Sequence, residues 1–195
     1  GKDVTNEKMA LPTVSGLRPY QAKIFSCKYL ENHSWQEIRE FAFKENLFET
    51  LRQATSDRYY HNMVKILSKL ELSQLQVVAD DNEKDRLAML WLGFCKSFPF
   101  AYGFSEIVAN KFRDKDFELR TGDLWKYIAD KSVEYENLCD ISNSLRSKVK
   151  SVIFYNLRDA GYLNTLNEIL PANLSDKAKH AIGNEFLHLF PGETK

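Results

Sequence analysis

The sequence predicts an all-α fold, a compact bundle of about eight helices. Its 195 residues include only 8 glycines and 5 prolines, too few for the many tight turns of an all-β chain. Apolar residues also recur at spacings of three and four along most of the chain, which is the period of an amphipathic helix. We expect a flexible N-terminal segment over residues 1–16 and a single helical domain over 17–195, with a possible subdivision near 114–122.

Three helices are expected in the first third of the chain. A helix over about 18–32 has proline in its favoured first turn. Ser34 and Glu37 have the spacing of a capping box, in which each side chain accepts a backbone N–H of the other residue, so a second helix starts there. A third helix begins between 50 and 56 and carries apolar residues at helical spacing as far as Leu70.

The apolar stretch over 87–105 is compatible with a membrane span or with two buried helices. It contains a single charge, Lys96, and is about as long as the roughly 20 residues that a span needs. However, Pro99 and Gly103 interrupt it, and its flanks lack the aromatic and basic belts of a membrane anchor. We therefore expect no membrane segment, and two buried helices that meet near Ser97.

Helix-capping residues divide the remainder of the chain. Residues suited to N-cap positions precede four helices: Asp81, Asp123, Ser142 or Asn143, and Ser175. The helix that begins near Ser142 ends at Gly161, a glycine C-terminus. Between 113 and 122, charged and apolar residues alternate, which predicts a loop or a brief strand.

Charge and cysteine content limit the possible partners and compartment. The 27 Lys and Arg residues balance 27 Asp and Glu residues, so any site for a polyanion must be regional. Cys27, Cys95 and Cys139 are far apart in the sequence, which fits neither a disulfide framework nor a zinc site with paired ligands. A reducing cytoplasm is the expected location.

No catalytic or cofactor motif stands out from the background. The four histidines lack the four-residue spacing that places two imidazoles on one metal, and the chain has neither a glycine-rich phosphate loop nor a Gly-x-Ser-x-Gly elbow. Carboxylate pairs such as Asp80 and Asp81 are ordinary solvated groups at helix ends. We expect no enzymatic activity, no metal and no cofactor.

Two basic clusters are the candidate functional surfaces. Nine basic residues against six acidic ones lie between Arg18 and Lys69, and a second group of three cations opens the helix that begins near Ser142, where backbone N–H groups also favour phosphates. A solvated helix face is the alternative reading of both. Tyr59 and Tyr60 can stack on bases or belong to the core. The predicted nucleic-acid-binding residues are Arg52, Arg58, Lys65, Lys69, Arg146, Lys148 and Lys150.

Three groups of residues resemble the BrxA proteins of BREX bacteriophage-defence systems, and the resemblance spans about 17–190. In the N-terminal part they are Ser34-Trp35-Gln36-Glu37-Ile38-Arg39, Lys44-Glu45-Asn46-Leu47 and Arg52 with Thr55, Ser56 and Arg58. In the centre they are Leu90-Trp91-Leu92, Pro99-Phe100 and Phe104, followed by 142–150 and 157–161. The chain departs from the family pattern at Lys69, where arginine is expected; lysine keeps the charge but loses bidentate phosphate geometry.

The resemblance implies a small helical protein with a fold like that of the NusB antitermination protein. It also implies a non-enzymatic component that binds double-stranded DNA and acts beside the other BREX proteins. Two alternatives stay open: a protein-interaction scaffold for other defence subunits without functional DNA binding, and a winged-helix repressor. The last would need a β-hairpin after Tyr162, for which 163–169 is weak material.

Overall fold

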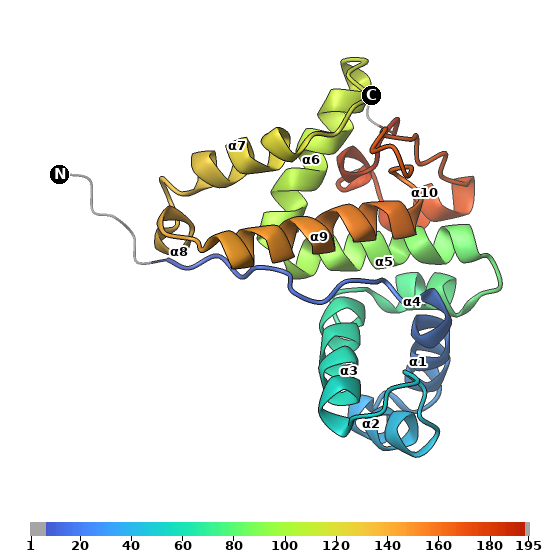
Figure 1. Cartoon of the computed structure of the whole chain (residues 1–195). Helices are drawn as coiled ribbons and strands as arrows, with labels where there is room; N and C mark the ends of the chain where they lie inside the picture. The colour runs from blue at the N-terminus through green and yellow to red at the C-terminus, as the bar shows by residue number, and fades with distance from the viewer. Residues whose placement is uncertain (1–6, 194–195) are drawn as a thin grey trace. The chain divides into compact units, whose positions relative to one another are not determined.

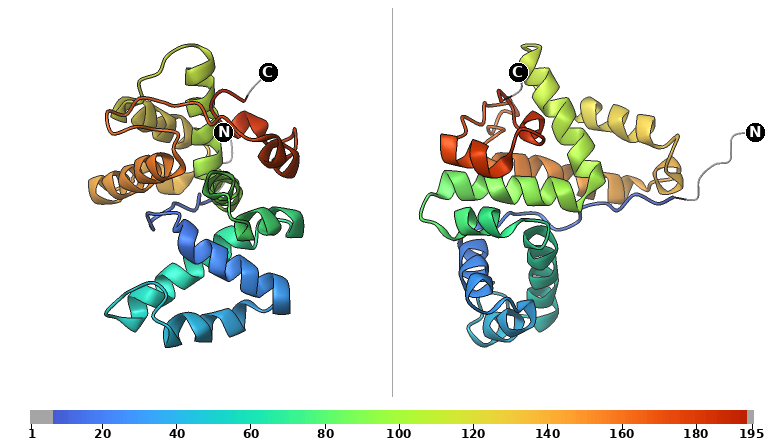
Figure 2. Two further views of the ribbon diagram at one scale, coloured as in Figure 1. Left: turned by 90° about the vertical axis from the view of Figure 1, so that its right-hand side faces the viewer. Right: turned by 180° about the vertical axis from the view of Figure 1, so that it is seen from behind.

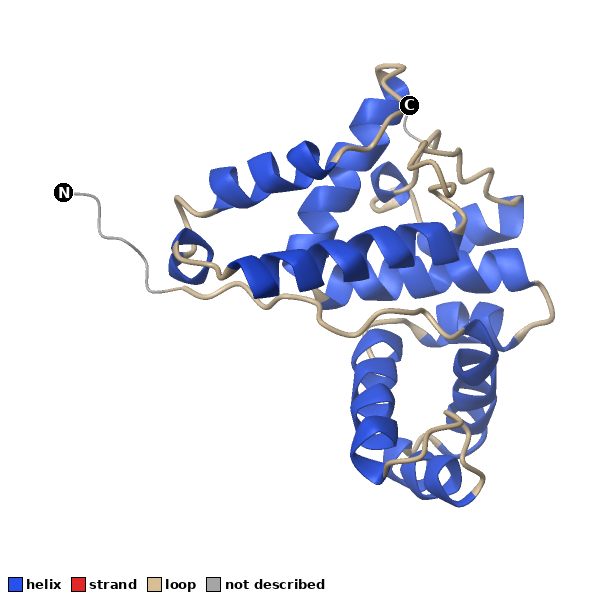
Figure 3. Ribbon diagram, viewed as in Figure 1, coloured by secondary structure: helices blue, strands red, loops and turns tan. Residues whose placement is uncertain are grey.

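The computed structural model describes residues 7–193, and within them the secondary structure is helical. Ten α-helices and one 3₁₀ turn occur in this range, and no β-strand does (Figure 1, Figure 3). Two isolated bridges, Glu118 with Glu168 and Leu163 with Ile169, are the only β-type pairings among the described residues. The predicted all-α class is confirmed, with ten helices rather than about eight.

The chain is arranged as two compact units. The first, which we call the α9 unit, comprises the N-terminal segment up to Gly16, Phe98–Asn173 and the end of the chain from His188. The second, the α3 unit, comprises Leu17–Ser97 and Leu174–Leu187. The single domain over 17–195 stays a prediction of the sequence. The segment 114–122, the predicted place of a subdivision, lies inside the α9 unit.

The α3 unit is built around one helix that is apolar on every side. This helix, α5, buries Ala88 to Cys95 without a break, and it packs against α1, α3, α4 and α10. In two further views α1, α2 and α3 follow one another around one end of the unit (Figure 2). The helices of this unit are α1 (Pro19–Asn32), α2 (Trp35–Lys44), α3 (Gln53–Leu67), α4 (Leu72–Ala79), α5 (Glu83–Ser97) and α10 (Asp176–Ile182).

The α9 unit depends on a close approach between two of its helices. A Cβ atom at Gly103 of α6 would overlap the hydroxyl of Tyr127 of α7, so glycine is needed there. The Tyr127 hydroxyl is buried and donates to the carbonyl oxygen of Phe100 at 2.9 Å. The helices are α6 (Pro99–Arg113), α7 (Thr121–Lys131), α8 (Glu136–Cys139) and α9 (Asn143–Ala160), and the 3₁₀ turn Leu187–Leu189 follows later in the chain.

Residues 7–16, which we call the N-terminal strap, are extended and tied to the α9 unit by polar contacts. The side-chain oxygen of Asn156, a residue only 1% exposed, accepts the Gly16 backbone N–H at 2.7 Å. Asn137 both accepts from the Met9 N–H and donates to the Met9 carbonyl, each at 2.9 Å. Of the segment 1–16 that the sequence predicts to be flexible, residues 1–6 lie outside the described residues.

Several helix ends form as the sequence predicts. The hydroxyls of Ser34, Ser142 and Ser175 each accept the backbone N–H three residues on, and Gly161 ends α9 in the left-handed conformation at φ 88°. Ser34 and Glu37 form only half of a capping box, because the Glu37 carboxylate accepts from the side chain of Asn32 instead.

Two predicted caps are wrong. Asp123 is the third residue of α7, whose N-cap is Arg120, and its carboxylate accepts the Arg120 backbone N–H at 2.7 Å. The predicted cap of the central helix is wrong by one residue. The Asn82 side chain accepts the Asp85 N–H at 3.0 Å at the start of α5, whereas Asp81 forms an ion pair with Lys23 at 2.7 Å. Because the Asp81 carboxylate is bound to Lys23, it is less available to the start of α5 than the neutral amide of Asn82, and Asn82 therefore caps the helix in its place.

The apolar stretch over 87–105 is divided between α5 and α6, which meet at Ser97 and Phe98 as predicted. Leu90, Trp91 and Phe94 are each at most 1% exposed. Among residues 7–193, no helix has both the length and the apolar character that crossing a membrane would require.

Candidate nucleic-acid interface

Three of the predicted cations form an exposed surface along α3, which we call the α3 basic face. Arg58 and Lys65 are seven residues apart, so they lie on the same side of the helix two turns from each other, and Lys69 follows just beyond its end. All three are exposed. Within the described residues neither Arg58 nor Lys69 has a carboxylate partner. Their charges are therefore available to a polyanion.

Other basic residues of the α3 unit are engaged within the protein. Lys23 forms an ion pair with Asp81. The Lys28 ammonium lies 3.7 Å from the centre of the Phe41 ring. Arg39 donates to both oxygens of Asp57, at 3.0 and 3.1 Å, and this hydrogen bonding lowers the pKa of the Asp57 carboxyl. Lys23, Lys28 and Arg39 thus make contacts within the protein, and fewer than nine of the basic residues counted in the sequence remain available to bind a polyanion.

The two tyrosines beside Arg58 do not present free ring faces. The Arg18 guanidinium lies 3.8 Å above the ring centre of Tyr59, and the Arg58 guanidinium lies 5.5 Å from it. Tyr60 is 5% exposed, and its hydroxyl donates to the carbonyl of Trp35 at 2.7 Å. The structure therefore favours the core interpretation of Tyr60 and a cation-stacked role for Tyr59 over stacking on bases.

The three predicted cations of α9 do not share a face. Arg146 and Lys150 are four residues apart and lie on one side of the helix, whereas Lys148, two residues from each, points about 200° away from Arg146. The Arg146 guanidinium stacks 4.4 Å from the ring of Trp125 on α7, and its Nη2 donates to the side-chain oxygen of Asn143 at 3.2 Å. Its Nε is buried without a hydrogen-bond partner in the described chain. Lys148 is exposed and Lys150 is half-buried.

Lys150 opens onto a depression of about 390 Å³ along α9, which we call the α9 cleft. A second cation, Arg158, lines the same cleft, and its Nη1 donates to the side-chain oxygen of Asn167 at 3.1 Å. Tyr155 forms part of the wall and is 50% exposed. The lining contains no carboxylate; it consists of Ser15, Lys150, Ser151, Phe154, Tyr155, Arg158 and Asn167.

Arg158 and Tyr155 are candidate functional residues that the sequence reasoning missed. A usable signal exists: Ser151, Tyr155 and Arg158 are spaced by four and three residues and therefore lie on one side of a helix.

The remaining reactive side chains form no recognisable metal or disulfide site. No group of three or more His, Cys, Asp or Glu residues suited to a metal ion occurs between residues 7 and 193. The three cysteines are free thiols. The Nε2 atom of His188 lies 3.3 Å from both the Tyr102 hydroxyl and a carboxylate oxygen of Glu106, whereas His61 contacts Asp57 at 3.4 Å.

Comparisons with known proteins place the chain in a family. No curated protein matches the sequence. Among solved structures, an uncharacterized protein from Magnetospirillum magneticum is similar, with a TM-score of 0.73 and 15% identity over 90% of this chain and 91% of that one. At that identity the likeness shows the fold alone. The family model of BrxA matches residues 13–185, nearly the whole chain. The chain therefore belongs to the BrxA family.

Proposed function

We propose that this chain, a component of a BREX phage-defence system by its family, is a non-enzymatic protein that binds duplex DNA mainly through phosphates. The observation that carries the proposal is the α9 cleft, in which two cations lie in a lining without carboxylates. Phosphate contacts from Lys and Arg supply most of the affinity of sequence-independent DNA binding.

The spacing within the α9 cleft suits a nucleic-acid backbone. Lys150 and Arg158 are eight residues apart, which corresponds to about 12 Å along a helix and is comparable with the width of the major groove of B-DNA. Ser151 and Tyr155, both exposed between them, add hydroxyl donors of the kind that contact phosphate oxygens. Lys148 adds a charge on the exposed side of the same helix.

The α3 basic face supports the same function from the other unit. Arg58, Lys65 and Lys69 present charge along a helix side without an aromatic ring free to stack on a base. A surface of this type neutralises phosphates and reads little sequence. Arg146 is assigned a packing role against Trp125 in this proposal, because its guanidinium is already stacked.

The proposal is tested by fluorescence-anisotropy titrations with duplex DNA, single-stranded DNA and RNA at several salt concentrations. We expect the duplex to bind, with little dependence on its sequence, and its affinity to fall steeply as salt rises. Flat titrations for all three probes at low salt would contradict nucleic-acid binding.

The scaffold alternative makes a different prediction for salt. Docking onto other defence subunits through apolar contacts would be far less sensitive to salt than phosphate binding. The large apolar side chains that are most exposed, Leu51, Val133 and Leu166, lie in three separate loops, and such scattered residues are ordinary on protein surfaces. We therefore place DNA binding first.

A further inference from the structure

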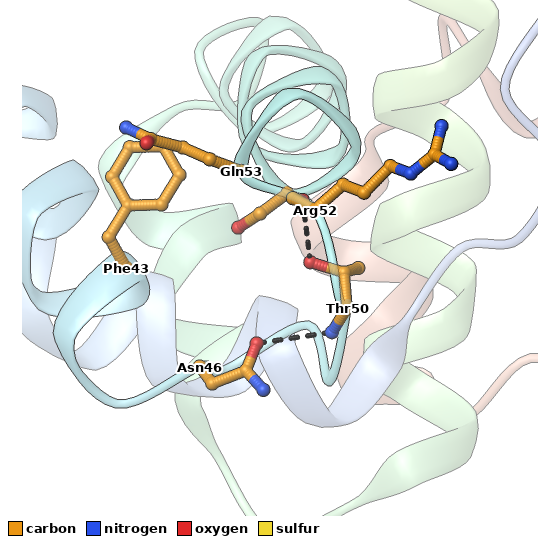
Figure 4. Close-up of a pocket in the computed structure, with 6 residues that line it drawn as sticks. Phe43, Asn46, Thr50, Arg52 and Gln53 are labelled. Atoms are coloured by element: carbon orange, nitrogen blue, oxygen red, sulfur yellow. Dashed lines mark hydrogen bonds between the residues drawn. The ribbon is translucent and has the colours of Figure 1, made fainter.

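A pocket of about 340 Å³ lies at the beginning of α3, in the α3 unit (Figure 4). The loop between α2 and α3 shapes it. The Asn46 side-chain oxygen accepts the Thr50 backbone N–H at 3.1 Å, and the Thr50 hydroxyl donates to the Arg52 carbonyl at 3.1 Å (Figure 4). These bonds fix the loop and leave the Asn46 amide NH₂ group as a donor at the pocket wall.

The first turn of α3 contributes further donors to this pocket. Arg52 occupies the N-cap position and provides no side-chain acceptor, and the first turn contains no acidic residue. Within residues 7–193, the backbone N–H groups of Gln53, Ala54 and Thr55 have no hydrogen-bond acceptor. In a 15-residue helix these groups carry the positive end of the helix dipole, which favours an anion.

A buried serine gives an independent indication of a ligand. Ser56 lines the pocket and is only 4% exposed, yet its hydroxyl has no hydrogen-bond partner among the described residues. Among the described residues, the fully buried side-chain atoms without a partner do not include the Ser56 oxygen, so this oxygen keeps some exposure and is accessible to a ligand in the pocket that Ser56 lines. An acceptor atom of a ligand in the pocket would satisfy this hydroxyl.

The lining of the pocket selects the chemistry of that ligand. Its polar side chains are two amides, two hydroxyls and the Arg52 guanidinium, which is its one charge, and it has no carboxylate. Arg52 forms no ion pair within the described chain. A phosphate group combines negative charge with several strong acceptor oxygens, and it matches both the helix N-terminus and arginine.

We propose that the pocket formed by Asn46, Arg52, Gln53 and Ser56 is a binding site for a phosphate group. Oxygens of the phosphate accept from the N–H groups of the first turn of α3 and from the Ser56 hydroxyl. Arg52 adds positive charge at the edge of the pocket, where its exposed side chain extends away from Phe43, Gln53 and Asn46 (Figure 4). The site stands on its own observations and does not depend on DNA binding at the α9 cleft.

The test is an NMR titration of the full ¹⁵N-labelled chain with sodium phosphate, with sodium chloride at equal ionic strength as the reference. Saturable shifts are expected for the amides of Gln53, Ala54, Thr55 and Ser56. The start of α9, where Ser142 already caps the helix, is an internal control and should not shift. The absence of saturation at the α3 amides, or equal shifts at the start of α9, would overturn the proposal.

Two substitutions separate a built site from a general attraction of anions. Ser56→Ala removes one hydrogen bond and is expected to weaken phosphate binding about fivefold, and Arg52→Gln about tenfold or more. The matched controls are Ser73→Ala, an exposed serine of the same unit, and Lys84→Gln, an exposed charge outside the pocket. Unchanged phosphate affinity in folded Ser56→Ala and Arg52→Gln would also overturn the proposal. Because Arg52 is exposed, its variant stays informative if Ser56→Ala does not fold.

Competition identifies the source of the phosphate group. If duplex DNA shifts the same four amides and displaces inorganic phosphate, the ligand is a phosphodiester of the DNA backbone. If inorganic phosphate saturates the site and duplex DNA leaves these amides unchanged, the ligand is a free phosphate or a small monoester. Both results support the site, and the second does so even if the chain binds no DNA.

Discussion

Replacing Arg146 by Gln should destabilise the protein, whereas replacing Lys148 by Gln should not. The two residues are neighbours in the sequence cluster, but the Arg146 guanidinium stacks 4.4 Å from Trp125 and Lys148 is exposed. A cation over an indole ring contributes about 0.5–2 kcal/mol, and the aliphatic part of a half-buried arginine adds packing. We expect Arg146→Gln to lower the free energy of unfolding by about 1 kcal/mol.

The sign of this effect distinguishes the packing contact from the helix dipole. Removing a cation near a helix N-terminus should stabilise the helix by about 0.3–1 kcal/mol if the dipole alone decides. For a chain of this size, a loss of about 1 kcal/mol lowers the melting temperature by about 2–4 °C. Lys148→Gln, an exposed substitution, should stay within about 0.5 kcal/mol of the native protein.

Thermal melts followed by circular dichroism measure the stability of both variants, and anisotropy titrations with duplex DNA measure their affinity. We expect Lys148→Gln to weaken DNA binding at unchanged stability, and Arg146→Gln to show the opposite pattern. An Arg146→Gln variant with an unchanged or raised melting temperature and a weakened DNA complex would refute the packing role and return Arg146 to the phosphate-binding set.

Three further outcomes follow from the structure. Gly103→Ala should lower the free energy of unfolding by about 1–3 kcal/mol in urea denaturation, because the added Cβ overlaps the Tyr127 hydroxyl. The same substitution should cost less stability in a Tyr127→Phe background, which lacks this hydroxyl. An equal cost in the two backgrounds would argue against this contact. Arg39 lowers the pKa of Asp57, so this pair stabilises the fold above the ordinary aspartate pKa of about 3.9, and the stabilisation is lost as the pH falls below that value. Arg39→Gln should therefore reduce the loss of stability on acidification in melts at pH 3 to 6. An Arg39→Gln variant with the same pH profile as the native protein would contradict this role of the pair. Asn156→Ala removes the acceptor for the end of the N-terminal strap and should speed hydrogen exchange and proteolysis in residues 7–16, whereas unchanged protection would show that other contacts hold the strap.

The sequence predicts best those features that depend on a few neighbouring residues. Ser142 and Gly161 bound α9 because a serine hydroxyl and a glycine with positive φ act within one turn of the helix end. The apolar run over 87–105 likewise predicts burial whatever its partners are. The error at Asp81 has a non-local cause: Lys23, 58 residues earlier, takes the carboxylate, and Asn82 caps the helix instead.

The candidate site depends on contacts that sequence distance conceals. Arg146 contacts Trp125, which is 21 positions earlier, and nothing in the local run of cations indicates this stack. The α9 cleft joins Lys150 to Asn167, beyond the end of the helix. By contrast, the helical spacing of Tyr155 and Arg158 is visible in the sequence, so these two residues could have been found by following the exposed side of α9 along its whole length.

The most direct test of DNA binding through phosphates at the α9 cleft is the salt dependence of duplex affinity in the double variant Lys150→Gln with Arg158→Gln. Each phosphate contact contributes a slope of about 0.9 in a plot of log affinity against log salt concentration. We predict that the double variant binds more weakly at low salt and that its slope is shallower by about 1.8. A control with Lys84→Gln and Lys115→Gln, two exposed lysines outside both surfaces, should keep the native slope. A native slope in the α9 variant, or an equal reduction in the control, would contradict the proposal that these two cations bind DNA phosphates.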